Sequence, residues 1–209
     1  MRAKLIAAAA VMVAGGTFVL AQGGSRPASP AGTGATQVGG AYVKSARGSA
    51  YQGGKWIEIS YGRPIKRGRD LWGSGETYGK ALNDNAPVWR AGANMTTRLR
   101  SEVPLVIAGT TVAPGEYSVF IDLKPDNWTL IVSNWPHQKA YDPKNTLELW
   151  GSIGYTPDKD VVRASMTLGT LPFSMDQLTW GFLDMTDAGG KLAIMWDKVV
   201  ATVPFKIGS

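Results

Sequence analysis

Apolar and polar residues alternate along most of the chain after residue 41. In the segment 55–61, Ile57, Ile59 and Tyr61 fall on one face of an extended strand, while Glu58 and Ser60 fall on the other. Successive side chains of a strand point to opposite faces of a sheet, so this period of two predicts a strand with one face toward a hydrophobic core. The chain has no comparable long segment of helical periodicity.

The same pattern recurs in short segments separated by turn residues. Gln52-Gly53-Gly54 predicts a hairpin that joins a strand near 42–50 to the strand 55–61, and the clusters 124–127, 187–190 and 197–198 predict further turns. Other strands are expected at 96–101, 103–108, 116–123, 128–133, 146–153, 161–168, 178–185, 191–196 and 199–207. The predicted fold class is all-β: a single β-sandwich or jelly-roll-like domain of about ten strands over residues 41–209.

Residues 62–94 break this alternation and predict one long loop. Loops of this length in compact domains are usually functional or disordered. Trp72, Tyr78 and Trp89 argue against disorder, because large aromatic side chains in a loop generally pack. We therefore expect a loop with a functional or an architectural role.

The amino-terminal residues predict export. Arg2 and Lys4 precede an apolar run that ends at Val19-Leu20-Ala21, which is the pattern of a signal peptide over residues 1–21. An uncleaved membrane anchor is the alternative, since the run is close to the minimum length that spans a bilayer. Residues 22–40 contain little that can be buried and predict a flexible linker. We expect a periplasmic or secreted protein with no membrane insertion after cleavage.

Composition excludes several kinds of chemistry. The chain contains no cysteine and one histidine, His137, so neither a thiolate nucleophile nor a zinc site of the usual ligand number is expected. No metal and no cofactor are predicted. Hydrolysis by paired carboxylates stays open, because it needs only two well-placed acids. The candidates in or beside the long loop are Glu58, Asp70, Glu76 and Glu102.

Charge is unevenly distributed between the two halves of the chain. Residues 44–100 have a formal net charge of +7, whereas residues 101–209 have −4. Such asymmetry indicates either an anion-attracting face or two halves whose charges neutralise each other in the folded protein. Nucleic acid is not an expected partner, since an exported protein rarely meets it.

Arginine and aromatic residues gather within and beside the long loop. Guanidinium groups offer fixed pairs of donors to carboxylate, sulfate or phosphate groups, and aromatic rings can stack on sugars. This composition predicts a site for a saccharide or another small anionic molecule, or else a basic loop that holds the fold together. The candidate ligand-binding residues are Tyr61, Arg63, Lys66, Arg69, Trp89, Arg90 and Asn94.

Four ordered motifs resemble a bacterial exported family known as domain of unknown function 2911. They are Tyr61-Gly62-Arg63-Pro64 with the following Lys66-Arg67-Gly68-Arg69, Trp89-Arg90-Ala91-Gly92-Ala93-Asn94, Pro114-Gly115-Glu116-Tyr117-Ser118-Val119-Phe120, and Trp196 before a closing strand. The resemblance spans about residues 42–207. It implies an exported β domain but no activity, and Arg67 and the segment 79–87 depart from the family pattern.

Three functional hypotheses follow from the sequence. The first is an exported β-sandwich that binds a saccharide or an anionic envelope component at the arginine and tryptophan cluster. The second is a structural or protein-interaction module with an architectural basic loop. The third is a carboxylate-based hydrolase, although a protein without enzymatic activity is the expectation. The sequence does not indicate the oligomeric state.

Overall fold

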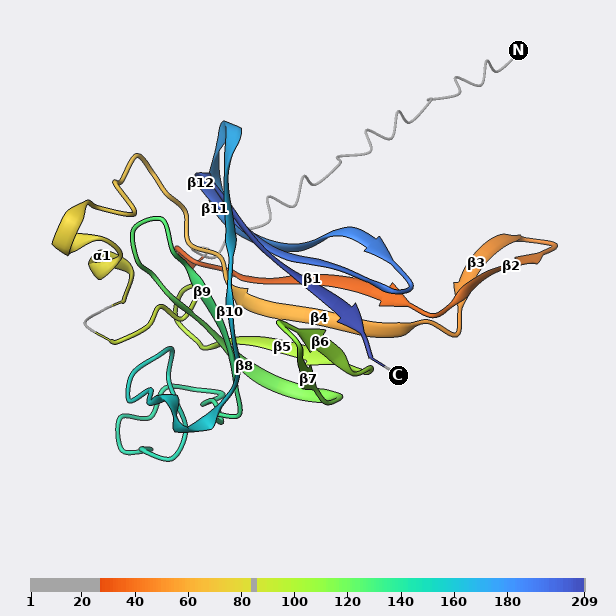
Figure 1. Ribbon diagram of the computed structural model, residues 1–209, viewed down its shortest axis with the longest axis horizontal. Helices are drawn as coiled ribbons and strands as arrows, with labels where there is room; N and C mark the ends of the chain where they lie inside the picture. The colour runs from red at the N-terminus through yellow and green to blue at the C-terminus, as the bar shows by residue number, and fades with distance from the viewer. Residues whose placement is uncertain (1–26, 84–85, 209) are drawn as a thin grey trace, which may run out of the picture.

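The computed structural model describes residues 27–83 and 86–208, and it confirms an all-β, sandwich-like architecture (Figure 1). The predicted signal peptide, residues 1–21, lies outside the described residues, as do residues 22–26 of the predicted linker. Within the described residues there are twelve strands in two larger sheets and one separate hairpin, compared with about ten strands predicted.

The larger sheet has six antiparallel strands. In spatial order they are β1 (Ala31–Val38), β4 (Lys55–Gly62), β5 (Thr97–Ser101), β8 (Gly115–Asp122), β9 (Thr129–Ser133) and β10 (Asp160–Ser165). The second sheet has four strands in the order β11 (Thr167–Thr186), β12 (Gly189–Ile207), β6 (Leu105–Ile107) and β7 (Thr110–Val112).

The remaining elements lie at the two ends of the molecule. The hairpin of β2 (Ala41–Ser45) and β3 (Gly48–Gln52) extends from one end of the long axis, and α1 (Lys80–Asn83) lies at the other (Figure 1). Two single turns of 3₁₀ helix, η1 (Gly75–Thr77) and η2 (Pro157–Lys159), belong to loops. No helix among the described residues is long and apolar enough to cross a membrane.

The hydrophobic core confirms the predicted orientation of the strand 55–61. Ile57, Ile59 and Tyr61 of β4 are buried, whereas Glu58 and Ser60 are only partly buried on the opposite face. The core extends to both sheets and includes the indoles of Trp89, Trp128, Trp180 and Trp196. A second, smaller cluster forms where the loop of residues 134–159 covers Phe120 and Ile131 on the outer side of the six-stranded sheet.

The predicted linker 22–40 is wrong for residues 31–38. These residues form β1, which pairs with β4 from Ala31 opposite Gly62 to Val38 opposite Lys55. Val38 is buried in the core. The folded domain therefore includes an edge strand that lies before the predicted boundary at residue 41.

The predicted hairpin around Gln52-Gly53-Gly54 is also wrong. β2 instead pairs with β3 across a tight turn at Ala46-Arg47, and β4 pairs with β1 and β5. The physical reason is burial. β4 has an apolar face and occupies the interior of a sheet, whereas β2 is exposed along its whole length.

Two further local predictions are wrong. Residues 146–153 remain a loop with one isolated bridge at Leu149, and Gly151 has a φ of 64°, outside the extended range. Asp197, predicted at a hairpin tip, lies within β12 with φ 52°, where the pairing with β11 shifts register at Met175. This is a bulge in a long strand.

The predicted hairpin tip at 187–190 is confirmed, since β11 ends at Thr186 and β12 begins at Gly189.

Candidate functional site

The end of β4 and the segment Trp89–Asn94 meet at the level of the backbone. A Cβ atom at Gly62 would fall on the carbonyl oxygen of Ala93, and one at Gly92 would lie 3.0 Å from the carbonyl oxygen of Gly62. The amide of Trp89 donates to the carbonyl oxygen of Ile121 at 2.8 Å, which fixes this segment beside β8. Two motifs distant in the sequence are thus in direct contact.

Next to this contact lies a cavity of about 340 Å³, which we call the arginine cavity. Four of the seven predicted residues line it, namely Arg69, Trp89, Arg90 and Asn94. The other described residues that line it are Ser29, Pro64, Ala81, Leu82, Gly92, Ala93, Trp150 and Trp196. The cavity is therefore built from the long loop, the 89–94 segment, β12 and the 134–159 loop.

Arg90 is the more enclosed of the two arginines. Its Nη1 atom donates to the carbonyl oxygen of Asn94 at 3.1 Å. A Cβ atom at Gly151 would lie 2.7 Å from the same Nη1 atom, so the 134–159 loop packs directly on the guanidinium. Burial lowers the pKa of Arg90, because a partly desolvated cation is less stable than a solvated one.

Arg69 is held along the wall of the cavity by its own loop. Its Nε atom donates to the carbonyl oxygen of Lys66 at 3.0 Å, and its Nη2 atom donates to that of Ile65 at 2.7 Å. The guanidinium carbon lies 6.0 Å from the centre of the Trp196 ring. Hydrogen bonds and a cation–π contact therefore fix the position of this charge.

Tryptophan side chains form the inner boundary of the cavity. Trp89 is 1% exposed and stacks on Trp196 with ring centres 6.2 Å apart and an interplanar angle of 13°. Trp72 packs edge-on against both rings of this pair, and Trp128 packs edge-on against Trp89. Trp89 is thus mainly a core residue, and the more accessible indole of the cavity is that of Trp150.

Asn94 closes the cavity near the beginning of the described chain. Its Nδ2 atom donates to the carbonyl oxygen of Ser29 at 3.2 Å, and its φ of 62° lies in the left-handed region that asparagine tolerates better than most residues. The side chain therefore links the 89–94 segment to the residues that precede β1.

The other three predicted residues do not line the cavity. Tyr61 is 3% exposed in the core, and its hydroxyl lies 3.5 Å from the carbonyl oxygen of Trp180. Arg63 extends to β11, where it donates to the carbonyl oxygen of Leu178 and to Thr179 Oγ1, both at 3.4 Å. Lys66 pairs with Asp197 at 2.6 Å. The side chains of Arg63 and Lys66 connect the long loop to the second sheet.

Sequence reasoning missed Trp150 and underestimated Trp196. Trp150 belongs to a segment that alternates like a strand, and nothing in its neighbours indicates a cavity. Trp196 has a usable signal, since it stands in one of the four ordered motifs.

Three of the four carboxylates considered for hydrolysis have hydrogen-bond or ion-pair partners within the protein. Asp70 accepts the amides of Trp72 and Gly73 in a turn, and Glu102 accepts the amide of Trp56 at 2.9 Å. Glu58 lies 3.7 Å from Arg100 on the outer face of the six-stranded sheet. Across residues 27–83 and 86–208, no three histidine, aspartate or glutamate side chains gather as metal ligands.

Fold and cavity together define this chain as an all-β, sandwich-like domain with an arginine- and tryptophan-lined pocket. Residues 44–205 match the family model described as "Protein of unknown function (DUF2911)", and the chain belongs to that family. No curated protein and no solved structure matches the chain. Membership in this family therefore assigns no activity to the chain.

Proposed function

We propose that the protein is an exported binding domain and that the arginine cavity accepts an acidic saccharide. One observation supports this most strongly: two guanidinium groups, an asparagine and an accessible indole converge on one concave space of about 340 Å³. This volume lies within the range of small-molecule sites, about 300–1,000 Å³. The guanidinium groups suit a carboxylate or sulfate, and the indole suits the apolar face of a sugar ring.

Fixed donors favour such a ligand energetically. Arg69 and Arg90 are held in place by the protein's own carbonyl groups, so little side-chain freedom remains to be lost when a ligand binds. Partial burial of Arg90 also strengthens its attraction for an anion, since the local dielectric is lower than that of water.

Export to the periplasm or the exterior is part of this proposal. It is supported by the positively charged start and the apolar run of residues 1–21. A saccharide or an anionic envelope component is the class of partner that such a location makes available. We propose no reaction, because the described residues that line the cavity include no carboxylate and no histidine.

An architectural role for the basic loop is a second proposal, and it has its own support. Arg63 and Lys66 donate to groups of β11 and β12, which lie far away in the sequence. In this proposal the loop ties the two sheets together. The two proposals are compatible, since they concern different side chains of the same loop.

Calorimetric titration of the purified protein with digalacturonate tests the binding proposal, with maltose as the neutral comparison. We expect saturable binding of digalacturonate. Arg90→Gln and Trp150→Ala should each weaken it about tenfold, which corresponds to about 1.4 kcal/mol. Arg100→Gln is the matched control, because Arg100 is an exposed arginine that pairs with Glu58 outside the cavity. It should leave the affinity unchanged.

Two results would contradict the proposal. The first is no saturable heat with the unmodified protein. The second is an equal loss of affinity in the Arg100→Gln variant, which would indicate attraction by the overall positive charge. A large fall in melting temperature for Arg90→Gln would instead assign Arg90 to the architecture of the loop.

A further inference from the structure

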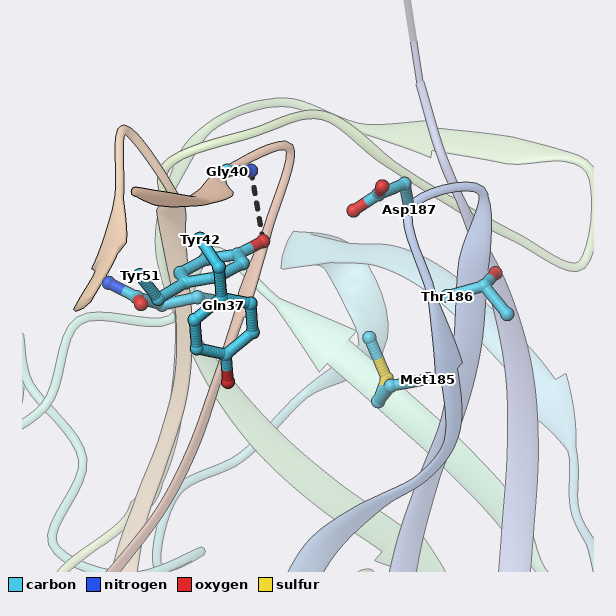
Figure 2. A pocket seen from close by; sticks show the side chains of 7 residues that line it. All are labelled: Gln37, Gly40, Tyr42, Tyr51, Met185, Thr186 and Asp187. Atoms are coloured by element: carbon cyan, nitrogen blue, oxygen red, sulfur yellow. Dashed lines mark hydrogen bonds between the residues drawn. The ribbon is translucent and has the colours of Figure 1, made fainter. Parts of the chain in front are cut away.

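A second cavity, of about 470 Å³, lies beside the β2–β3 hairpin, which extends from the end of the molecule opposite α1 (Figure 1). Figure 2 shows the residues that line it. We call it the tyrosine cavity. It separates the β2–β3 hairpin and the end of β1 from the tip of the β11–β12 hairpin. The described residues that line it are Gln37, Gly40, Tyr42, Tyr51, Met185, Thr186 and Asp187.

Two tyrosine rings form one wall of the tyrosine cavity. Tyr42 is 76% exposed, and its ring centre lies 5.3 Å from that of Tyr51 at an interplanar angle of 70°. This exposure follows from the position of β2, which is exposed along its whole length. The arrangement leaves aromatic surface open to a ligand.

Tyr51 is fixed in position by its surroundings. Its hydroxyl accepts the amide of Gly40 at 2.9 Å, the bond drawn in Figure 2. A Cβ atom at Gly40 or at Gly54 would lie 2.5 or 2.6 Å from its ring, so both glycines are needed for the ring to lie where it does. Tyr42 thus packs edge-on against a rigid neighbour, and the aromatic wall is preorganised.

Asp187 and Met185 form the opposite wall and face the tyrosines across the gap (Figure 2). Asp187 Oδ1 accepts the amide of Gly39 at 3.0 Å, which leaves further lone pairs of the carboxylate available. Asp184, on the same hairpin, is paired with Lys191 at 2.7 Å. The described lining of the tyrosine cavity therefore contains one carboxylate and no lysine or arginine, in contrast to the arginine cavity.

We propose that the tyrosine cavity binds an organic ammonium group. Aromatic faces attract cations through the ring quadrupole, a carboxylate neutralises their charge, and a thioether provides polarizable contact with methyl groups. An anionic ligand would meet Asp187 without a compensating cation in the described lining. This site is independent of the proposed function, since it uses none of the residues of the arginine cavity.

Choline is a suitable probe, because its trimethylammonium group has the required charge and size. Titration of the purified protein, followed by the amide shifts of residues 37–42 and 185–187 in ¹H–¹⁵N spectra, should give saturable changes. Tyr42→Ala and Asp187→Asn should each weaken binding at least about fivefold. Both changes spare the fold, since Tyr42 is exposed and an asparagine at 187 still accepts the amide of Gly39.

One matched control lies on the same hairpin and the other lies in a distant loop. Asp184→Asn removes another acid of the same hairpin, and Tyr141→Ala removes an exposed tyrosine of the 134–159 loop. Both should leave choline binding unchanged. The proposal is wrong if choline causes no saturable shift, or if the neutral isostere 3,3-dimethylbutan-1-ol binds equally well, since the site would then be apolar. Digalacturonate binding should be unaffected by the Tyr42 and Asp187 substitutions, so the two proposals fail separately.

Discussion

His137 is held on the outer side of the six-stranded sheet by a charged neighbour. Its Nε2 atom lies 2.8 Å from Arg98 Nη1, which can only donate, so Nε2 must accept and the ring is neutral. Burial and the charge of Arg98 lower the pKa of His137, with a smaller contribution from Lys139. The carboxylates of Glu116 and Glu148 oppose this shift without reversing it.

We predict that the protein loses stability as the pH falls from about 7.5 to about 5.5. An unfolded histidine has a pKa of about 6.5, and the folded one lies lower, so the unfolded state takes up the proton first. The contribution of neutral His137 to stability is therefore fully present above the pKa of the unfolded state. It decreases as the pH falls toward the pKa of the folded state. His137→Gln, which keeps an acceptor for Arg98, should reduce the difference in melting temperature between these pH values. An identical difference in both proteins would contradict the assignment.

The contact between β4 and the 89–94 segment depends on a glycine. Gly62 has no room for a side chain, because the carbonyl group of Ala93 occupies the position of its Cβ atom. Gly62→Ala should lower the free energy of unfolding by about 3 kcal/mol through overpacking, as measured by denaturant titration. Gly181→Ala is the matched control, since its nearest neighbour is the Cε atom of Met195 at 4.0 Å. Equal effects of the two substitutions would show that the close approach does not matter.

At the scale of the elements, alternation predicted strands well wherever one face is buried. β4, β5, β8 and β9 lie close to their expected positions, since their apolar faces form the core. β1 was missed for a physical reason. Its small residues Gly32 and Gly34 resemble a linker, but a Cβ atom at either position would collide with the Arg63 side chain or the backbone of Trp180. Close packing by other elements, not flexibility, explains this composition.

The candidate site was predictable only in part. Arg69, Arg90 and Asn94, which come from two of the motifs, line one cavity because the backbone contact at Gly62 joins the two segments. The directions of Arg63 and Lys66 depend on strand and loop geometry that no local pattern reveals. Trp150 comes from a loop whose position is set by buried contacts with Phe120 and Ile131.

At the scale of the whole molecule, ion pairs join the basic half of the chain to the acidic half. Lys66 pairs with Asp197 and Arg98 with Glu116, so the uneven charge along the sequence is partly neutralised in space. The charge that these ion pairs do not neutralise lies in particular regions of the surface. The arginine cavity lies beside α1, and the tyrosine cavity lies beside the β2–β3 hairpin at the other end, where the described lining has one carboxylate.

The edge strand β1 is expected to be essential for the stability of the sandwich. A chain that begins at Gly39 lacks this strand and leaves the edge of β4 unpaired. Its free energy of unfolding should fall by at least about 3 kcal/mol, or about 10 °C in Tm for a chain of this size. A chain that begins at Pro27 keeps β1 and is the reference for this comparison. Equal Tm values for both chains would contradict the role assigned to β1.

The most direct test of the central claim observes the arginine cavity during ligand addition. Indole N–H signals in ¹H–¹⁵N spectra report separately on Trp150, which lines the cavity, and on Trp56, which is 43% exposed at the opposite end of β4. With digalacturonate, we predict a saturable shift of the Trp150 signal whose midpoint moves to about tenfold higher ligand concentration in Arg90→Gln, while the Trp56 signal stays in place. An unmoved Trp150 signal, or equal shifts of both indoles, would contradict binding at this cavity.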